Sequence, residues 1–140
     1  MRAFDEGSRR TLEALGDVLI PAEDGMPSAS GVGVGGELLD RVLAARWDLA
    51  DALAALLEAA RGRDPAAVVA GLQASDPDAF TVLATFVAGG YFMDGSVRER
   101  LGYHGQHAVA IRPADVPNPE LLASVRSRGP TYVPTPPPAG

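Results

Sequence analysis

The sequence contains no cysteine and no lysine, and its aromatic content is only 6%. The absence of cysteine excludes disulfides, thiolate zinc sites, iron–sulfur clusters and covalently attached haem. The absence of lysine leaves arginine at all twelve basic positions, which we attribute to a coding bias rather than to selection for bidentate contacts. With few aromatic residues and abundant alanine and leucine, the composition favours helices over strands.

A long apolar run and an excess of positive charge are also lacking. The longest stretch without a charged residue, 79–93, is shorter than the roughly twenty residues of a membrane span. A net charge of −6 argues against a nucleic-acid partner, because the phosphates would be repelled. Arg9 and Arg10 precede an apolar stretch as in a twin-arginine export signal, but Glu13 and Asp17 interrupt it. We therefore expect a soluble chain with no membrane span.

What the sequence does contain is helical periodicity. Ser8 is the expected N-cap of the first helix, and Trp47 is expected in the core, within the apolar stripe of the second. The fourth helix is apolar nearly all round and should be central, with Gly89 and Gly90 letting another element approach closely. The predicted helices run from about Ser8 to Ile20, Glu37 to Arg61, Pro65 to Gln73 and from the Asp76 cap through Tyr91, followed by short helices at Ser96 to Leu101 and 118–128.

Neither a repeat nor an alternating apolar pattern supports a sheet. The expected fold is therefore all-α: a small domain of four to six helices with long irregular loops, of which Pro21 to Gly35 is the longest. The helical domain is expected to span 1–129. The proline-rich tail, 130–140, is expected to be extended in polyproline II.

The long loop ends in "GVGVGG", residues 31–36, a literal match to the G-x-G-x-x-G fingerprint. This fingerprint binds a dinucleotide only where it follows a buried strand and begins a helix within a βαβ unit. A helix does follow, but the preceding "PAEDGMPSAS" indicates an irregular loop rather than a strand. We expect a flexible loop that leads into a helix, and no cofactor-binding residue on this chain.

The two histidines, His104 and His107, lie in "HGQH". Two imidazoles three residues apart can ligate a metal, but the intervening glycine weakens helical presentation and the closest acid downstream is Asp115. We expect these histidines to be structural or to contact a partner, with a metal-dependent enzyme as the alternative. Neither a nucleophile elbow nor a tuned acid–base pair is indicated, so no catalytic residue and no metal ligand is expected.

Apolar residues are abundant in segments where little regular structure is expected. A small helical core cannot easily cover them, and extended segments with aromatic side chains commonly dock on another protein. Packing against the chain's own helices is the alternative. Tyr91, Phe92, Leu101, Tyr103, Val109 and Ile111 belong to this group, with Tyr132 and Val133 in the tail. The residues expected to bind a partner are Tyr91, Phe92, Leu101, Tyr103, His104 and Tyr132.

Two stretches together are characteristic of a known family. The first is "TLEALGDVLIPAEDGMPSASGVGV" running into "ELLDRVL", and the second is "FVAGGYFMDGSVRERLGYHGQ". In the second, a Gly-Tyr-Phe segment leads into Leu-Gly-Tyr-x-Gly. The two stretches occur in order and cover most of residues 11–107, and the chain in this respect resembles the gluconate 2-dehydrogenase subunit 3 family. The short proline-bearing tail also fits that family.

The resemblance implies a small, cofactor-free helical subunit that associates with a large flavoprotein of the glucose–methanol–choline oxidoreductase type. In that family the large subunit carries FAD and the catalytic histidine, and it oxidises sugars, sugar acids or glycosides. Some systems add a multihaem cytochrome as electron acceptor. The small subunit is implied to support folding of the flavoprotein, and a transient assembly or export chaperone is the alternative function.

In many members of the family the small subunit also supplies the export signal. In this sequence Met1 is followed almost directly by the first predicted helix. We therefore expect a cytoplasmic complex, with export alongside the partner as the alternative, and the cytochrome is correspondingly less expected.

Overall fold

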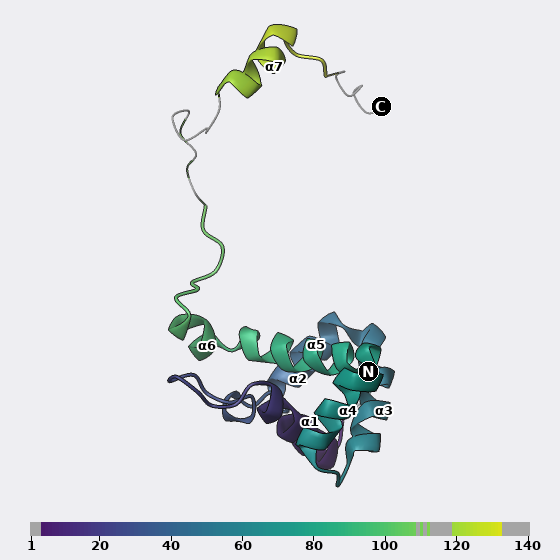
Figure 1. The fold of residues 1–140 in the computed structure, drawn as a ribbon. Helices are drawn as coiled ribbons and strands as arrows, with labels where there is room; N and C mark the ends of the chain where they lie inside the picture. Colours follow the sequence, from purple (N-terminus) through teal and green to yellow (C-terminus); the bar gives the residue numbers. More distant parts are fainter. Residues whose placement is uncertain (1–3, 109, 111, 113–118, 133–140) are drawn as a thin grey trace, which may run out of the picture. The chain divides into compact units, whose positions relative to one another are not determined.

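The computed structural model describes residues 4–108, 110, 112 and 119–132. Within these residues the structure is helical, and the strand-like pairing is limited to an isolated bridge between Glu23 and Met26, so the all-α prediction is confirmed. The chain divides into two compact units, Met1–His104 and Gly105–Gly140. The α-helices of the first unit are α1 (Glu6–Leu19), α2 (Glu37–Ala45), α3 (Ala50–Ala60), α4 (Pro65–Ser75), α5 (Pro77–Met93) and α6 (Gly95–Arg100) (Figure 1).

Helix α5 is the centre of the first unit, as its nearly uniform apolar composition predicts. It packs against α1, α2, α3, α4 and α6, and Leu83, Phe86 and Val87 on it are fully buried. The pair of glycines near its end lies against α2. A Cβ atom on Gly89 would come within 3.5 Å of the Val42 methyl groups, and one on Gly90 would lie 3.6 Å from Cβ of Leu38. The two glycines therefore lie against another helix, but at these ordinary contact distances a Cβ atom would fit, so the packing does not require glycine.

Aspartate caps set the beginnings of four of these helices, α1, α4, α5 and α6. Asp64 accepts a hydrogen bond from the amide of Ala67, and Asp76 accepts one from the amide of Ala79, each followed by proline in the first turn, as the sequence predicts. The prediction that Ser8 is the N-cap of α1 is wrong. The helix begins earlier, because Asp5 accepts the Ser8 amide at 2.7 Å.

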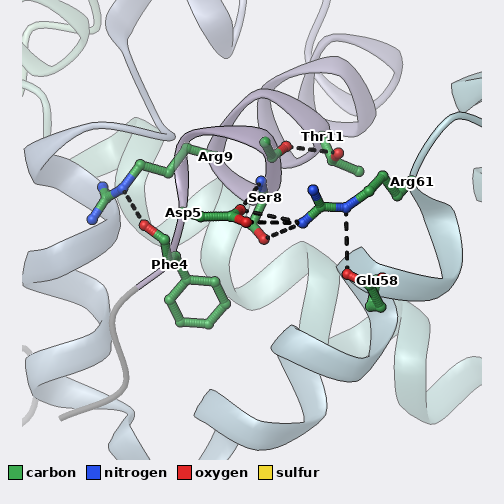
Figure 2. Close-up of polar contacts among 8 residues, drawn as sticks. Phe4, Asp5, Ser8, Arg9, Thr11, Glu58 and Arg61 are labelled. Atoms are coloured by element: carbon green, nitrogen blue, oxygen red, sulfur yellow. Dashed lines mark hydrogen bonds and ion pairs between the residues drawn. The ribbon is translucent and has the colours of Figure 1, made fainter.

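Asp5 also joins α1 to α3. Figure 2 shows its carboxylate between Ser8 and Arg61, whose guanidinium lies 3.2 Å from it and also pairs with Glu58. On the same turn Arg9 donates from Nε to the carbonyl oxygen of Phe4 at 3.1 Å. The start of α1 is thus held to its neighbours by charged hydrogen bonds.

The long second helix predicted from 37 to 61 is wrong. The structure divides it into α2, a 3₁₀ turn at Trp47–Leu49 and α3. Apolar residues such as Leu43 and Ala50 fall at a three–four spacing that would put Arg46 on the buried side of a continuous helix. At the break Arg46 instead pairs with Asp48 at the surface. Trp47, expected in the core, is 76% exposed as a result.

The second unit contains a 3₁₀ helix at Pro119–Leu122 and α7 at Ala123–Arg128, where a last short helix was predicted. Val125 on α7 is exposed, and so is Tyr132 beyond it. Asn118, predicted to open this helix, and residues 133–140 of the tail lie outside the described residues. The compact helical unit ends at His104, whereas the sequence suggested a helical domain that extends to residue 129. Nowhere in the described part is a helix both long and apolar enough to cross a membrane.

Candidate functional site

Three large apolar side chains around α6 are exposed to water. Phe92, near the end of α5, is 54% exposed, and Leu101 and Tyr103, directly after α6, are 54% and 52% exposed. We refer to these three as the α6-flanking residues. They agree with the expectation that this segment carries more apolar surface than the helical core covers. Exposed aromatic and aliphatic groups gathered on one short segment are typical of a protein-binding surface.

Helix α6, which separates these residues, is fixed at its start. Asp94 caps it by accepting hydrogen bonds from the amides of Ser96 and Val97 at 2.9 and 3.1 Å. Val97 is completely buried against the rest of the first unit. On the outer side Arg100 donates to the carbonyl oxygen of Gly25 at 2.7 Å. A helix of six residues therefore has a fixed position, although it is too short to be stable in isolation.

The end of α6 is fixed as well. Gly102 has φ of +70°, and the amide of Tyr103 donates to the carbonyl oxygen of Arg98 at 2.8 Å, in the manner of a helix C-terminal glycine cap. Leu101 and Tyr103 are therefore displayed from ordered backbone. Ordering them before a partner arrives lowers the entropy lost on association.

Tyr91 differs from the expectation that it is exposed for a partner. It is only 3% exposed, and its hydroxyl donates to the carbonyl oxygen of Pro27 at 2.7 Å. The reason is its place on α5. Tyr91 follows Gly90 and lies one helical turn after Val87, both of which are buried, so its side chain faces the core, whereas Phe92 faces water. Tyr91 belongs to the core of the first unit rather than to its surface.

His104 and His107 are both exposed. A shallow hollow of about 230 Å³ is lined by Gly95, Arg98, Glu99, Tyr103 and His104. Within the described residues, no group of three or more His, Asp or Glu side chains is placed to hold a metal ion. The described geometry thus puts His104 beside Tyr103 on the candidate partner surface.

The glycine loop has local structure of its own, although the sequence predicted an irregular loop. A 3₁₀ helix at Ser30–Val32 precedes Gly33, which has φ of +76°. The amides of Gly33 and Gly36 donate to the carbonyl oxygens of Ser30 and Gly33, both at 2.9 Å. In a dinucleotide site such amides face the pyrophosphate. Here both are used inside the loop.

Side chains from α1 hold this loop in place. Asp17 accepts the amide of Ser30 at 2.7 Å and also its hydroxyl. Burial raises the pKa of Asp17, but the hydrogen bonds from Ser30 and Ser28 together outweigh it, and the pKa is lowered overall. The pKa of Asp94 is lowered too, chiefly by the hydrogen bond from the Ser96 hydroxyl. Both carboxylates act as anions that fix the backbone.

The remaining apolar residues that the sequence analysis considered for a partner surface lie in the second unit or outside the described residues. Tyr132 is 78% exposed. Val109, Ile111 and Val133 lie outside the described residues. The structure thus leaves Phe92, Leu101, Tyr103, His104 and Tyr132 available to a partner and removes Tyr91 from that group.

One exposed aromatic residue was missed by sequence reasoning. Trp47 was placed in the core because it continues an apolar stripe, yet it is exposed on the turn between α2 and α3. The signal that could have found it is the adjacent Arg46, a charged residue at a core position of the same stripe.

The sequence was compared with protein-family models, with curated proteins and with solved structures, and none of them matches the chain.

Proposed function

We propose that this chain is the non-catalytic small subunit of a heteromeric FAD-dependent oxidoreductase of the glucose–methanol–choline type. The substrate class is a sugar, sugar acid or glycoside, oxidised on the large subunit. The proposal rests on where the exposed apolar residues lie in the sequence. The α6-flanking residues Phe92, Leu101 and Tyr103, exposed on ordered backbone, all lie within the second stretch that resembles the gluconate 2-dehydrogenase subunit 3 family.

Burial divides that stretch into two kinds of residue. Gly89, Gly90 and Tyr91 face α2 or the core, where they build the fold of this chain. Phe92 and Leu101 contribute little to that fold because they face water. Their exposure is accounted for if a larger protein covers them. In the complex we expect an obligate interface of about 2,000 Å² or more.

The role that follows is stabilisation of the large subunit. By covering apolar surface of the flavoprotein, the small subunit favours its folded, FAD-competent state by mass action. FAD is assigned to the partner. The internal use of the Gly33 and Gly36 amides supports this assignment, because it leaves these groups of the glycine loop unavailable for a pyrophosphate.

The test is expression of the flavoprotein with and without this chain. We expect soluble, flavin-loaded and active enzyme only when both are present, with the two chains eluting together at constant stoichiometry. Normal yield and activity of the flavoprotein alone would contradict the proposal. If the flavoprotein needs the chain to fold but elutes without it, the chain is a transient assembly chaperone instead.

A pair of variants tests whether the α6-flanking residues form the interface with the flavoprotein. Leu101→Ser removes an exposed apolar side chain and should reduce recovery of the complex, whereas Gln73→Ala, at an exposed position of α4, should leave it unchanged. Variants at His104 and His107 address the metal-enzyme alternative. Unchanged turnover of the complex with His104→Ala and His107→Ala would remove it.

A further inference from the structure

Trp47 is the single tryptophan of the chain and the most exposed large apolar side chain described in the first unit. We infer that Trp47 is an anchor by which this chain binds the flavoprotein, at a contact additional to the α6-flanking residues. This inference rests on the function proposed above. It assigns to the interface a residue outside the α6 region.

The turn that carries Trp47 is fixed by hydrogen bonds on both sides. The amide of Arg46 donates to the carbonyl oxygen of Val42 at 2.8 Å, which completes α2. The amide of Leu49 donates to the carbonyl oxygen of Arg46 at 3.1 Å, which closes the turn. Leu49 and Ala50 then pack against the core. The indole is therefore presented from rigid backbone, as anchor residues at interfaces are.

The charges beside the indole are already paired. Arg46 binds Asp48 through two hydrogen bonds, Nε to Oδ1 at 3.0 Å and Nη2 to Oδ2 at 2.9 Å. This pairing lowers the pKa of Asp48 and raises that of Arg46, so both stay ionised. An indole flanked in this way can enter an apolar pocket without leaving an unpaired charge beside it. The bidentate pair would form a polar rim around the pocket.

The net charge of the chain indicates the occupant. At −6 the chain is repelled by an anionic lipid surface and by a second copy of itself. A different protein whose contact surface is neutral or basic experiences no such repulsion. The size of a stable interface also indicates a further contact. Such an interface uses about 20–30 residues on each side, far more than the α6-flanking residues supply. The partner's matching feature is an apolar pocket with a hydrogen-bond acceptor for the indole N–H.

The anchor is separate from the α6-flanking residues along the fold. Gly90, close to Phe92 on α5, lies against Leu38 in the first turn of α2, whereas Trp47 follows the last turn of that helix. Nine residues of α2 correspond to about 13 Å of helix. Two contacts so separated would fix the orientation of the partner as well as its position.

The experiment uses the complex of this chain with its flavoprotein. Because the chain has one tryptophan, 5-fluorotryptophan incorporated into it alone gives one ¹⁹F resonance that reports on Trp47. We expect this resonance to move on complex formation and to lose its sensitivity to solvent deuteration. We also expect Trp47→Ala to weaken binding by at least about thirtyfold, with the melting temperature of the free chain unchanged. Gln73→Ala, also on an exposed helix surface, is the control and should bind normally.

The outcomes separate the inference from the function on which it rests. A complex in which Trp47 keeps its solvent exposure, or binds equally well as Trp47→Ala, overturns the anchor and leaves the proposed function standing. Failure of the two proteins to associate overturns both. Reversible dimers of this chain that Trp47→Ala abolishes would assign the contact to a second copy and overturn the inference.

Discussion

Tyr91 and Phe92 are adjacent on α5 and their rings meet edge to face, with centroids 5.5 Å apart and planes at 86°. Their environments are opposite, because Tyr91 is 3% exposed and Phe92 is 54% exposed. The hydroxyl of Tyr91 connects α5 to the loop before α2 through Pro27. One ring therefore stabilises the fold, and its neighbour extends the same aromatic pair to the surface.

Substitution of these neighbours should separate stability from binding. Tyr91→Ala should lower the free energy of unfolding by about 3 kcal/mol or more, since it leaves a cavity in the core. Phe92→Ala should lower it by about 1 kcal/mol or less and should weaken binding of the flavoprotein at least about tenfold. Urea denaturation and titration with the partner measure the two effects. Equal loss of stability in both variants would show that Phe92 is not a surface residue.

Replacement of Arg9 by lysine should lower the free energy of unfolding. Its guanidinium donates to the carbonyl oxygens of Phe4, Gly35 and Gly36 and, at 2.7 Å, to Asp40. A lysine ammonium lacks the planar fork that reaches these acceptors together, so Arg9→Lys should cost about 1–3 kcal/mol in urea denaturation.

The neighbouring arginine provides the control. Arg10 pairs with Glu6 while both side chains remain more than 70% exposed, at 74% and 71%. Arg10→Lys should therefore change the free energy of unfolding by less than about 0.5 kcal/mol. A similar loss in both variants would mean that the Arg9 contacts do not stabilise the loop.

The glycine motif can be tested at Gly35. A Cβ atom there would lie 2.7 Å from the carbonyl oxygen of Arg9 and 2.9 Å from Cγ of Glu13. Backbone of α1 would have to move, so Gly35→Ala should destabilise the chain by about 1–3 kcal/mol. Gly71, at an exposed position of α4, has nothing within 4 Å of such an atom, and Gly71→Ala should stabilise by about 0.4–1 kcal/mol. Thermal unfolding that shows the same sign for both would refute this packing role.

Local signals in the sequence predicted much of the fold. Each Asp-Pro pair marked the start of a helix, because the carboxylate satisfies free amides and proline fits the first turn. The glycine pair at 89 and 90 predicted a neighbouring element without identifying it, and the structure shows that this element is α2. Such features need no knowledge of the rest of the chain.

The errors came from features that depend on tertiary structure. Apolar spacing alone continued the second helix through Arg46 and placed Trp47 in the core, because periodicity takes no account of the cost of burying that arginine. The site prediction failed at Tyr91, whose acceptor on Pro27 lies 64 residues away. Periodicity cannot identify such a partner. The exposure of Phe92, Leu101 and Tyr103 was predicted because too few helical residues remained to cover them.

Asp5 should make stability depend on pH in the acid range. The Ser8 amide, then the Ser8 side chain and Arg61, lower its pKa from 3.8 to about 2. A carboxylate whose pKa is lower in the folded chain stabilises fully above 3.8, and this contribution is lost as the pH falls toward 2. Asp5→Asn keeps the cap but not the charge that pairs with Arg61. Its melting temperature should lie below that of the wild type at neutral pH, and the difference should vanish across this window. A difference independent of pH would assign the effect to the cap geometry alone.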